Sequence, residues 1–379
     1  MASSSSNRLF SIDLLRVLAC FLVVHQHCAQ QFYAITGKVE VGDDTFFVGI
    51  NSALGRICVP LFVMVSGYFL LPMRGTLKDF MQRRLSRIVT PFIVWYAVYC
   101  VFFIFYSGDS PVQAVANFFG LFVNFMGPLE HLWYIYMIIG LYLVVPIISP
   151  WIERASKREL QFYLVLWLIS GLLPYLHAYV SPEMWGECFW NSNSMLCWFT
   201  GFGGYMVAGH YLRRFGAFSV LSSIVMIVIG WIPTATLFIH RMYQYNDFEH
   251  LEMSFNFGSL GVILMALGVF SLFMHLRWKG EGFIGRLLSD VAAKGYGMYL
   301  GHIVILLLTH TLLCNYYPEI FNVVTGEGYT YHRIWGGIPA VLVAVPIHAC
   351  ITFVLTYALM KTLSFSSCLE SDLKDLPTY

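Results

Sequence analysis

The feature that most restricts the fold of this chain is a succession of long apolar runs separated by short polar connections. About 20 helical residues, rising about 1.5 Å each, cross the hydrocarbon core of a bilayer, and most of the runs reach that length. The sequence therefore predicts ten membrane-spanning helices. Their expected ranges are Leu9–Tyr33, Phe46–Leu71, Ile88–Ser107, Leu132–Ser149, Gln161–Val180, Ser194–Leu212, Phe218–Ile239, Phe255–His275, Tyr296–Cys314 and Trp335–Leu363.

Composition agrees with this class of protein. Of the 379 residues, 58% are hydrophobic and 11% are charged, whereas about a quarter of a soluble domain is charged. We predict an all-α, polytopic transmembrane bundle that forms one domain over residues 1–379, with a polar N-terminal segment at 1–8 and a polar tail at 364–379. No basic soluble stripe is present, so we expect no nucleic-acid partner. The expected partners include membrane lipids.

Positive residues are distributed unequally between the two predicted sides of the membrane. With a cytoplasmic N-terminus, 17 of the 22 Lys and Arg residues fall in cytoplasmic segments. Short cytoplasmic connections are enriched in such residues, so both termini are predicted to be cytoplasmic. The apolar segment at 112–126 is shorter than the other runs and is expected to lie at the interface or to re-enter between spans.

The first predicted span carries ionisable residues that are costly inside a membrane: Asp13, Arg16, His25 and His27. Eleven helical steps return to within about 20° of the starting direction, so Arg16 and His27 share one face and are about 16 Å apart along the axis. His25 points away from Arg16. These residues either form a functional polar channel or are buried polar groups that interact only with neighbouring helices. If they form a functional channel, Arg16 and His27 are the candidate catalytic residues.

The second span contains another buried cation in the stretch RICVPLFVMVSGYFLL, which begins at Arg56. Pro60 favours a kink, and Ser66 and Gly67 permit another helix to approach closely. Arg56 is expected to face the interior of the bundle.

Basic residues also gather before and within the third span. Arg84 and Arg87 are three positions apart and therefore project from one helix face, with Lys78 and Arg83 nearby. Guanidinium groups suit phosphate oxygens, so the four residues are candidates for holding an anionic cofactor. Ordinary positive-inside placement and binding of lipid headgroups explain the same pattern.

Other polar residues complete the candidate site. Glu130, His131 and Trp133 lie where the fourth span meets the predicted outer surface, and His302 lies within the ninth span. His131 also fits an interfacial anchor, and His302 also fits a hydrogen-bonded packing residue. The cysteines show no CxxC or Cys/His ligand spacing, so no metal site is expected.

Five motifs follow one another along the chain: IDLLRVLACFLVVHQH, RICVPLFVMVSGYFLL, RRLSRIVTPFIVW, HLWYIYMIIGLYLVVP and GYGMYLGHIVIL. In this order they resemble the acyltransferase 3 family of integral membrane acyltransferases. Within that family the chain is most similar to stand-alone bacterial surface-polysaccharide O-acetyltransferases, of the type that modifies enterobacterial common antigen.

The resemblance implies transfer of an acetyl group from acetyl-CoA to a hydroxyl of a cell-surface glycan or its lipid-linked precursor, in the bacterial cytoplasmic (inner) membrane. It implies that Arg16 and His27 are the functional pair and that Arg84 and Arg87 are the RxxR motif of the third span. The positions of Arg56, Ser66, Tyr68, Trp133 and His302 are also typical of the family, as possible substrate-binding residues.

This chemistry suits the residues. An alcohol is a poor nucleophile until its proton is removed, and imidazole, with a reference pKa of about 6.5, is a suitable base near neutral pH. His27 would be that base, and a nearby cation would stabilise the oxyanion of the tetrahedral intermediate. A covalent acyl-histidine is the alternative mechanism. A transporter or flippase for an anionic substrate or glycolipid would use the same residues to line a pathway.

Overall fold

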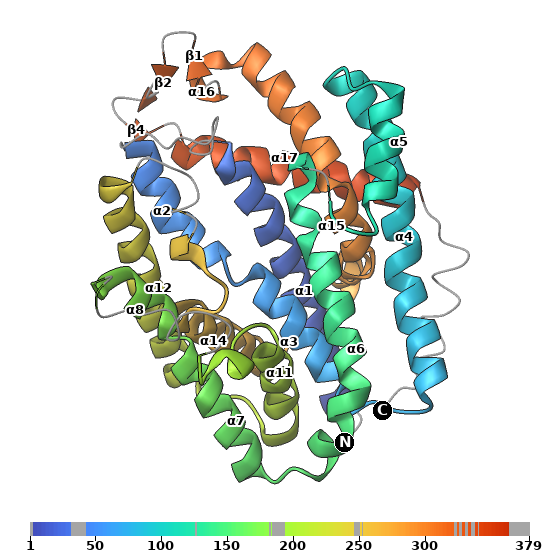
Figure 1. Cartoon of the computed structure of the whole chain (residues 1–379), viewed down its shortest axis with the longest axis vertical. Coiled ribbons are helices and arrows are strands. Elements are labelled where there is room, and N and C mark those ends of the chain that lie inside the picture. The colour runs from blue at the N-terminus through green and yellow to red at the C-terminus, as the bar shows by residue number, and fades with distance from the viewer. Residues whose placement is uncertain are drawn as a thin grey trace. The chain divides into compact units, whose positions relative to one another are not determined.

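The computed structural model describes residues 3–31, 43–125, 127–181, 183, 194–245, 251, 253–321, 324–325, 328–329, 333–334, 338–339 and 341–363 (Figure 1). The predicted polar tail at 364–379 lies outside these described residues.

The prediction of an all-α membrane protein is confirmed. The helices are α1 (Ser3–Gln30), α2 (Asp43–Gly55), α3 (Cys58–Leu70), α4 (Leu77–Tyr106), α5 (Pro111–Gly120), η1 (Gly127–Leu132), α6 (Trp133–Arg154), α7 (Lys157–Ser170), α8 (Leu173–Tyr179), η2 (Cys197–Phe199), α11 (Gly203–Phe215), α12 (Val220–Gln244), η3 (Met253–Phe255), α14 (Leu260–His275), α15 (Gly282–Tyr316), α16 (Pro318–Phe321) and α17 (Val341–Thr362). Two antiparallel ladders of two-residue strands pair β1 (Val324–Thr325) with β2 (Gly328–Tyr329) and β3 (Arg333–Ile334) with β4 (Ile338–Pro339).

Eight helical stretches of the described chain are long and apolar enough to cross a membrane. The other two expected spans fall on shorter helices, α11 with 13 residues and α14 with 16. The count of ten spans and the cytoplasmic termini therefore stay predictions. Helix α5 has ten residues, about 15 Å, which agrees with the expectation that this segment does not span the bilayer.

The chain forms two compact units. Unit 1 comprises residues 1–61, 217–256 and 261–379, and unit 2 comprises residues 62–216 and 257–260. In unit 1, α1 packs against α15 and α17, and α2 packs against α12. In unit 2, α4 packs against α5 and α6, and α7 packs against α11.

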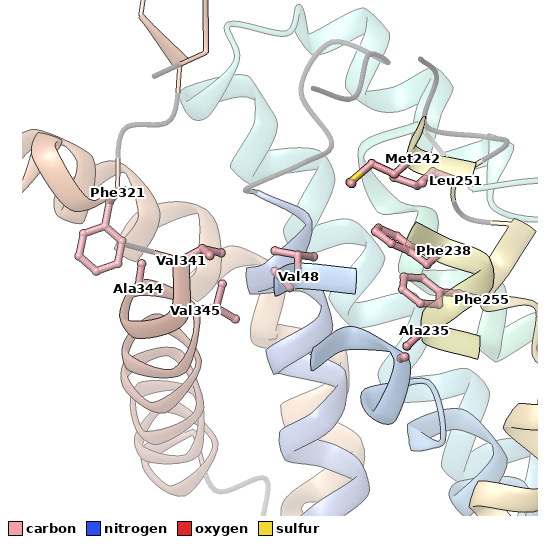
Figure 2. Packing of buried hydrophobic residues seen from close by; sticks show 12 residues of the cluster. Val48, Ala235, Phe238, Met242, Leu251, Phe255, Phe321, Val341, Ala344 and Val345 are labelled. Atoms are coloured by element: carbon pink, nitrogen blue, oxygen red, sulfur yellow. The ribbon is translucent and has the colours of Figure 1, made fainter. Parts of the chain in front are cut away.

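A buried apolar cluster forms a core of unit 1 (Figure 2). The rings of Phe238 on α12 and Phe255 on η3 are stacked with their centroids 4.5 Å apart, and both side chains are almost fully buried. Trp231 on α12 donates a hydrogen bond from its indole nitrogen to the carbonyl of Ile50 on α2, at 2.9 Å. These contacts hold η3 and α2 against the same face of α12.

The predicted second span is interrupted at Arg56 and Ile57, between α2 and α3. Pro60 explains the position of this break. An uninterrupted helix would need the backbone nitrogen of residue 60 to donate to the carbonyl of Arg56, but proline has no N–H and its ring collides with that carbonyl. The expected kink is thus confirmed, and it places Arg56 at the junction of the two helices.

Two glycines in unit 2 allow α3 and α11 to cross at very short range. A Cβ atom at Gly67 would lie 1.9 Å from the carbonyl oxygen of Met206, and one at Gly209 would lie 2.0 Å from that of Met64. Each helix therefore presents a glycine to the backbone of the other. The close approach predicted from Gly67 is confirmed, since no larger residue fits at this crossing without moving a helix.

We predict that Gly67→Ala destabilises the protein by about 1–3 kcal/mol, because the added methyl group must separate the two backbones. The measurement is the thermal unfolding midpoint of the purified protein in detergent, which is expected to fall by several degrees. Gly140→Ala on α6 is the matched control, since a Cβ there meets nothing within 4 Å. Equal midpoints for the two variants would contradict the tight crossing.

Candidate active site

His27 lies in the last turn of α1, and its ring has a defined hydrogen-bond partner. The Nδ1 atom of His27 is 2.9 Å from the side-chain oxygen Oε1 of Gln30, one helical turn further along. An amide oxygen can only accept a hydrogen bond, so Nδ1 carries the proton. In the neutral ring this tautomer leaves the lone pair on Nε2, as a general base requires.

A second imidazole lies beside His27. The ring centroids of His27 and His302 are 5.1 Å apart at an interplanar angle of 42°, and His302 is fully buried on α15. The Nδ1 atom of His302 is 2.6 Å from the backbone carbonyl of Tyr299, which again defines the tautomer with the lone pair on Nε2. The packing of α1 against α15 therefore brings together two predicted site residues from opposite ends of the chain.

Arg56 supplies a positive charge to the same unit. The residue is 8% exposed, and its guanidinium carbon lies 4.5 Å from the centroid of the Phe255 ring. This cation–π contact orients the guanidinium, which acts electrostatically on His27. Arg56, His27 and His302 thus form the part of the predicted site that the structure assembles in unit 1.

Arg16 lies on α1 eleven residues before His27. Its Nη1 atom is 3.5 Å from the Oδ1 atom of Asp13, and its side chain is 39% exposed. Because α1 is unbroken between the two positions, Arg16 and His27 share a helix face as predicted but are separated by about 16 Å. Arg16 therefore does not contact the imidazole directly.

The predicted cofactor residues lie in the first turns of α4, in unit 2. Lys78 and Arg83 are exposed, whereas Arg84 and Arg87 are half-buried. The acidic residue in this turn, Asp79, accepts a hydrogen bond from the hydroxyl of the N-cap Thr76 at 2.7 Å. Lys78 lies in the first turn, at the positive end of the helix dipole, and Arg83, Arg84 and Arg87 follow in the second and third turns.

The remaining predicted residues also lie in unit 2. The Ser66 hydroxyl donates to the Phe62 carbonyl at 3.0 Å, and Arg213 donates to the Tyr68 carbonyl at 2.7 Å. The first contact lies within α3 and the second involves the backbone of Tyr68, so substrate binding by the side chains of Ser66 and Tyr68 stays a prediction.

Three neighbouring positions close to α6 differ in exposure. Glu130 is exposed, and His131 is buried with its ring 5.7 Å from that of Tyr99. Trp133 begins α6 and packs against Phe202 and Phe257, with ring centroids 5.6 and 5.4 Å away.

Sequence reasoning missed two residues at the His27 site. Gln30 was detectable, because a hydrogen-bonding residue three positions after a histidine lies on the same helix face. Phe255 carried no such signal, since nothing local in the sequence distinguishes it from the many other phenylalanines.

The described residues include no group of three or more His, Cys, Asp or Glu side chains able to hold a metal ion. The fold and site define a multi-pass helical membrane protein in which a half-buried imidazole, His27, lies beside a fully buried one, His302, in the same unit as the buried Arg56. Residues 9–359 match the family model of the acyltransferase 3 domain, described as an acyltransferase domain, and the chain therefore belongs to this family. Searches of curated proteins and of solved structures found no match.

Proposed function

We propose that this protein is an O-acetyltransferase of the bacterial cytoplasmic membrane, which transfers acetyl from acetyl-CoA to a hydroxyl of a cell-surface glycan or lipid-linked glycan precursor. The family assignment supports acyl transfer. The observation that carries the more specific chemistry is the contact between His27 and Gln30, because it selects the tautomer that a general base needs.

In the proposed reaction, Nε2 of His27 removes the proton from the acceptor hydroxyl as its oxygen attacks the thioester carbonyl. The negative charge that develops on the carbonyl oxygen is stabilised by a cation, for which Arg56 is the candidate, because Arg16 lies about 16 Å from His27 along α1. When the intermediate collapses, the carbon–sulfur bond breaks and the imidazolium returns its proton to the CoA thiolate. The products are the acetyl ester and free CoA.

The test is to bind acetyl-CoA to the purified protein and to measure free thiol after a candidate glycan is added. An acetyltransferase releases one CoA for each ester formed. A transporter or flippase moves its substrate without producing thiol. Acetyl-CoA binding with no thiol release for any hydroxyl acceptor would contradict the proposed reaction.

We predict that Arg84→Ala and Arg87→Ala each weaken acetyl-CoA binding about tenfold or more, because each removes a charge-assisted hydrogen bond worth about 1.5–3 kcal/mol. Lysine should restore only part of the affinity, since it lacks the bidentate geometry of guanidinium. The measurement is a binding isotherm in detergent. Arg74→Ala removes an exposed charge from the preceding connection and is the matched control. Unchanged isotherms for both α4 variants would favour a lipid-headgroup role.

A further inference from the structure

An aromatic groove lies in unit 2, and none of the residues assigned above lines it. Its volume is about 420 Å³, and it is lined by Trp151, Arg158, Glu159, Phe162, Tyr163 and Phe199. These residues come from α6, α7 and η2, and α7 follows α6 directly along the chain (Figure 1). Four of the six side chains are aromatic, and the mouth carries one positive and one negative residue.

The walls of the groove are held in place by local contacts. The ring of Tyr163 lies 5.7 Å from that of Trp151 in an edge-on arrangement and 6.1 Å from that of Phe199. Trp167, one turn further along α7, donates from its indole nitrogen to the carbonyl of Gly201 at 3.1 Å. This bond fixes the segment after η2 against α7, so the groove is a built feature of the fold.

The two charges at the mouth are not equivalent. Glu159 belongs to the capping box that begins α7, and its carboxylate accepts a hydrogen bond from the backbone nitrogen of Ser156 at 2.7 Å. Lys157 points toward another aromatic residue, Phe215, with its Nζ atom 5.5 Å from the ring centroid. Arg158 is exposed at the groove, so it is the cation placed to meet an anionic ligand.

An apolar stripe on α7 continues from Arg158 along the same helix face. Phe162, Val165 and Ile169 follow Arg158 at four, seven and eleven positions, within about 40° of its direction. Their exposed fractions are 67%, 50% and 45%. A cation followed by about 16 Å of exposed apolar surface matches a molecule with an anionic head and an aliphatic chain.

We propose that this groove binds one anionic phospholipid of the surrounding bilayer. Its phosphate meets Arg158, and one acyl chain enters between Trp151, Phe162 and Phe199 and then follows Val165 and Ile169. The mouth lies beside the α6–α7 connection, which is predicted to be cytoplasmic, and basic pockets between helices on this side are suited to anionic headgroups. The exposed aliphatic residues that follow the groove on α7 favour an acyl chain over the ribose and adenine of a nucleotide.

The test is native mass spectrometry of the delipidated, full-length protein titrated with dioleoyl phosphatidylglycerol or dioleoyl phosphatidylethanolamine. We expect the first phosphatidylglycerol to bind about tenfold more tightly than phosphatidylethanolamine, and Arg158→Gln to remove that preference. Arg154→Gln is the matched control, because it removes the same charge from the same end of the helix pair outside the groove. The proposal would be overturned if the wild-type protein bound the two lipids equally. It would also be overturned if Arg158→Gln and Arg154→Gln lost the preference for phosphatidylglycerol to the same extent.

A second measurement places the acyl chain. Phosphatidylglycerol with brominated chains should quench tryptophan fluorescence less in Trp151→Phe than in the wild-type protein, because Trp151 lines the groove. Equal quenching would show that the chain lies elsewhere. If CoA displaces the bound lipid and its own binding depends on Arg158, the groove is a nucleotide site and the lipid assignment is wrong.

Discussion

His27→Ala is expected to lower the turnover of acetyl transfer by about 10²–10⁴-fold, the usual contribution of a positioned general base. Without the imidazole, no group at this position can remove the proton from the acceptor hydroxyl. The predicted cofactor residues on α4 are untouched, so acetyl-CoA affinity should change little. The measurements are the rate of thiol release and the acetyl-CoA binding isotherm of the same purified sample.

Variants of two nearby residues complete the test of His27. His25→Ala should have a mild effect, since the Nε2 atom of His25 accepts a hydrogen bond from Asn51 at 3.0 Å on another face of α1. Gln30→Leu should lower turnover because it removes the acceptor for Nδ1–H, whereas Gln30→Glu keeps an acceptor and should retain more activity. Near-normal turnover of His27→Ala would exclude His27 as the base.

Features of the helices could be predicted from the sequence where a physical rule depends only on neighbouring residues. Bilayer thickness predicted the apolar helices, and the missing N–H of Pro60 predicted a kink that the structure places at Arg56. Gly67 predicted a close crossing because only a residue without a side chain permits it. Helix α15 begins at Gly282, before the predicted span that starts at Tyr296, because charged residues mark the end of a membrane span without ending the helix.

The composition of the site was less predictable, because it depends on pairings between distant segments. His302 was identified as a single buried histidine, and only the packing of α15 against α1 shows that its ring lies 5.1 Å from that of His27. Phe255 contacts Arg56 through the short η3 helix, whose position depends on the core formed with α12. Periodicity within a helix contains no information on such partners.

The two substrates of the proposed reaction are expected to enter from opposite sides of the membrane. The charge distribution predicts that the N-terminus and the α4 residues Arg84 and Arg87 are cytoplasmic, where acetyl-CoA is made. His27 lies at the other end of α1, 18 residues or about 27 Å beyond Leu9. An extended cofactor, held by its phosphates at the cytoplasmic mouth, would thread its pantetheine arm inward past Arg16 toward His27. A glycan hydroxyl would arrive from the outer side, where Glu130 and His131 are candidates to receive it.

This arrangement predicts that transfer occurs only when each substrate is supplied to its own face of the membrane. In sealed proteoliposomes of one orientation, acetyl-CoA should support transfer only when it is supplied to the face that carries the α4 basic residues. An impermeant glycan acceptor should react only from the opposite face, because neither acetyl-CoA nor the polar glycan crosses the bilayer unaided. Permeabilising the vesicles with detergent should restore activity to every arrangement of substrates and is the internal control. Transfer with both substrates confined to the cytoplasmic face would refute transmembrane acetylation while leaving the acyltransferase assignment intact, because the chemistry at His27 would then be reached from one side only.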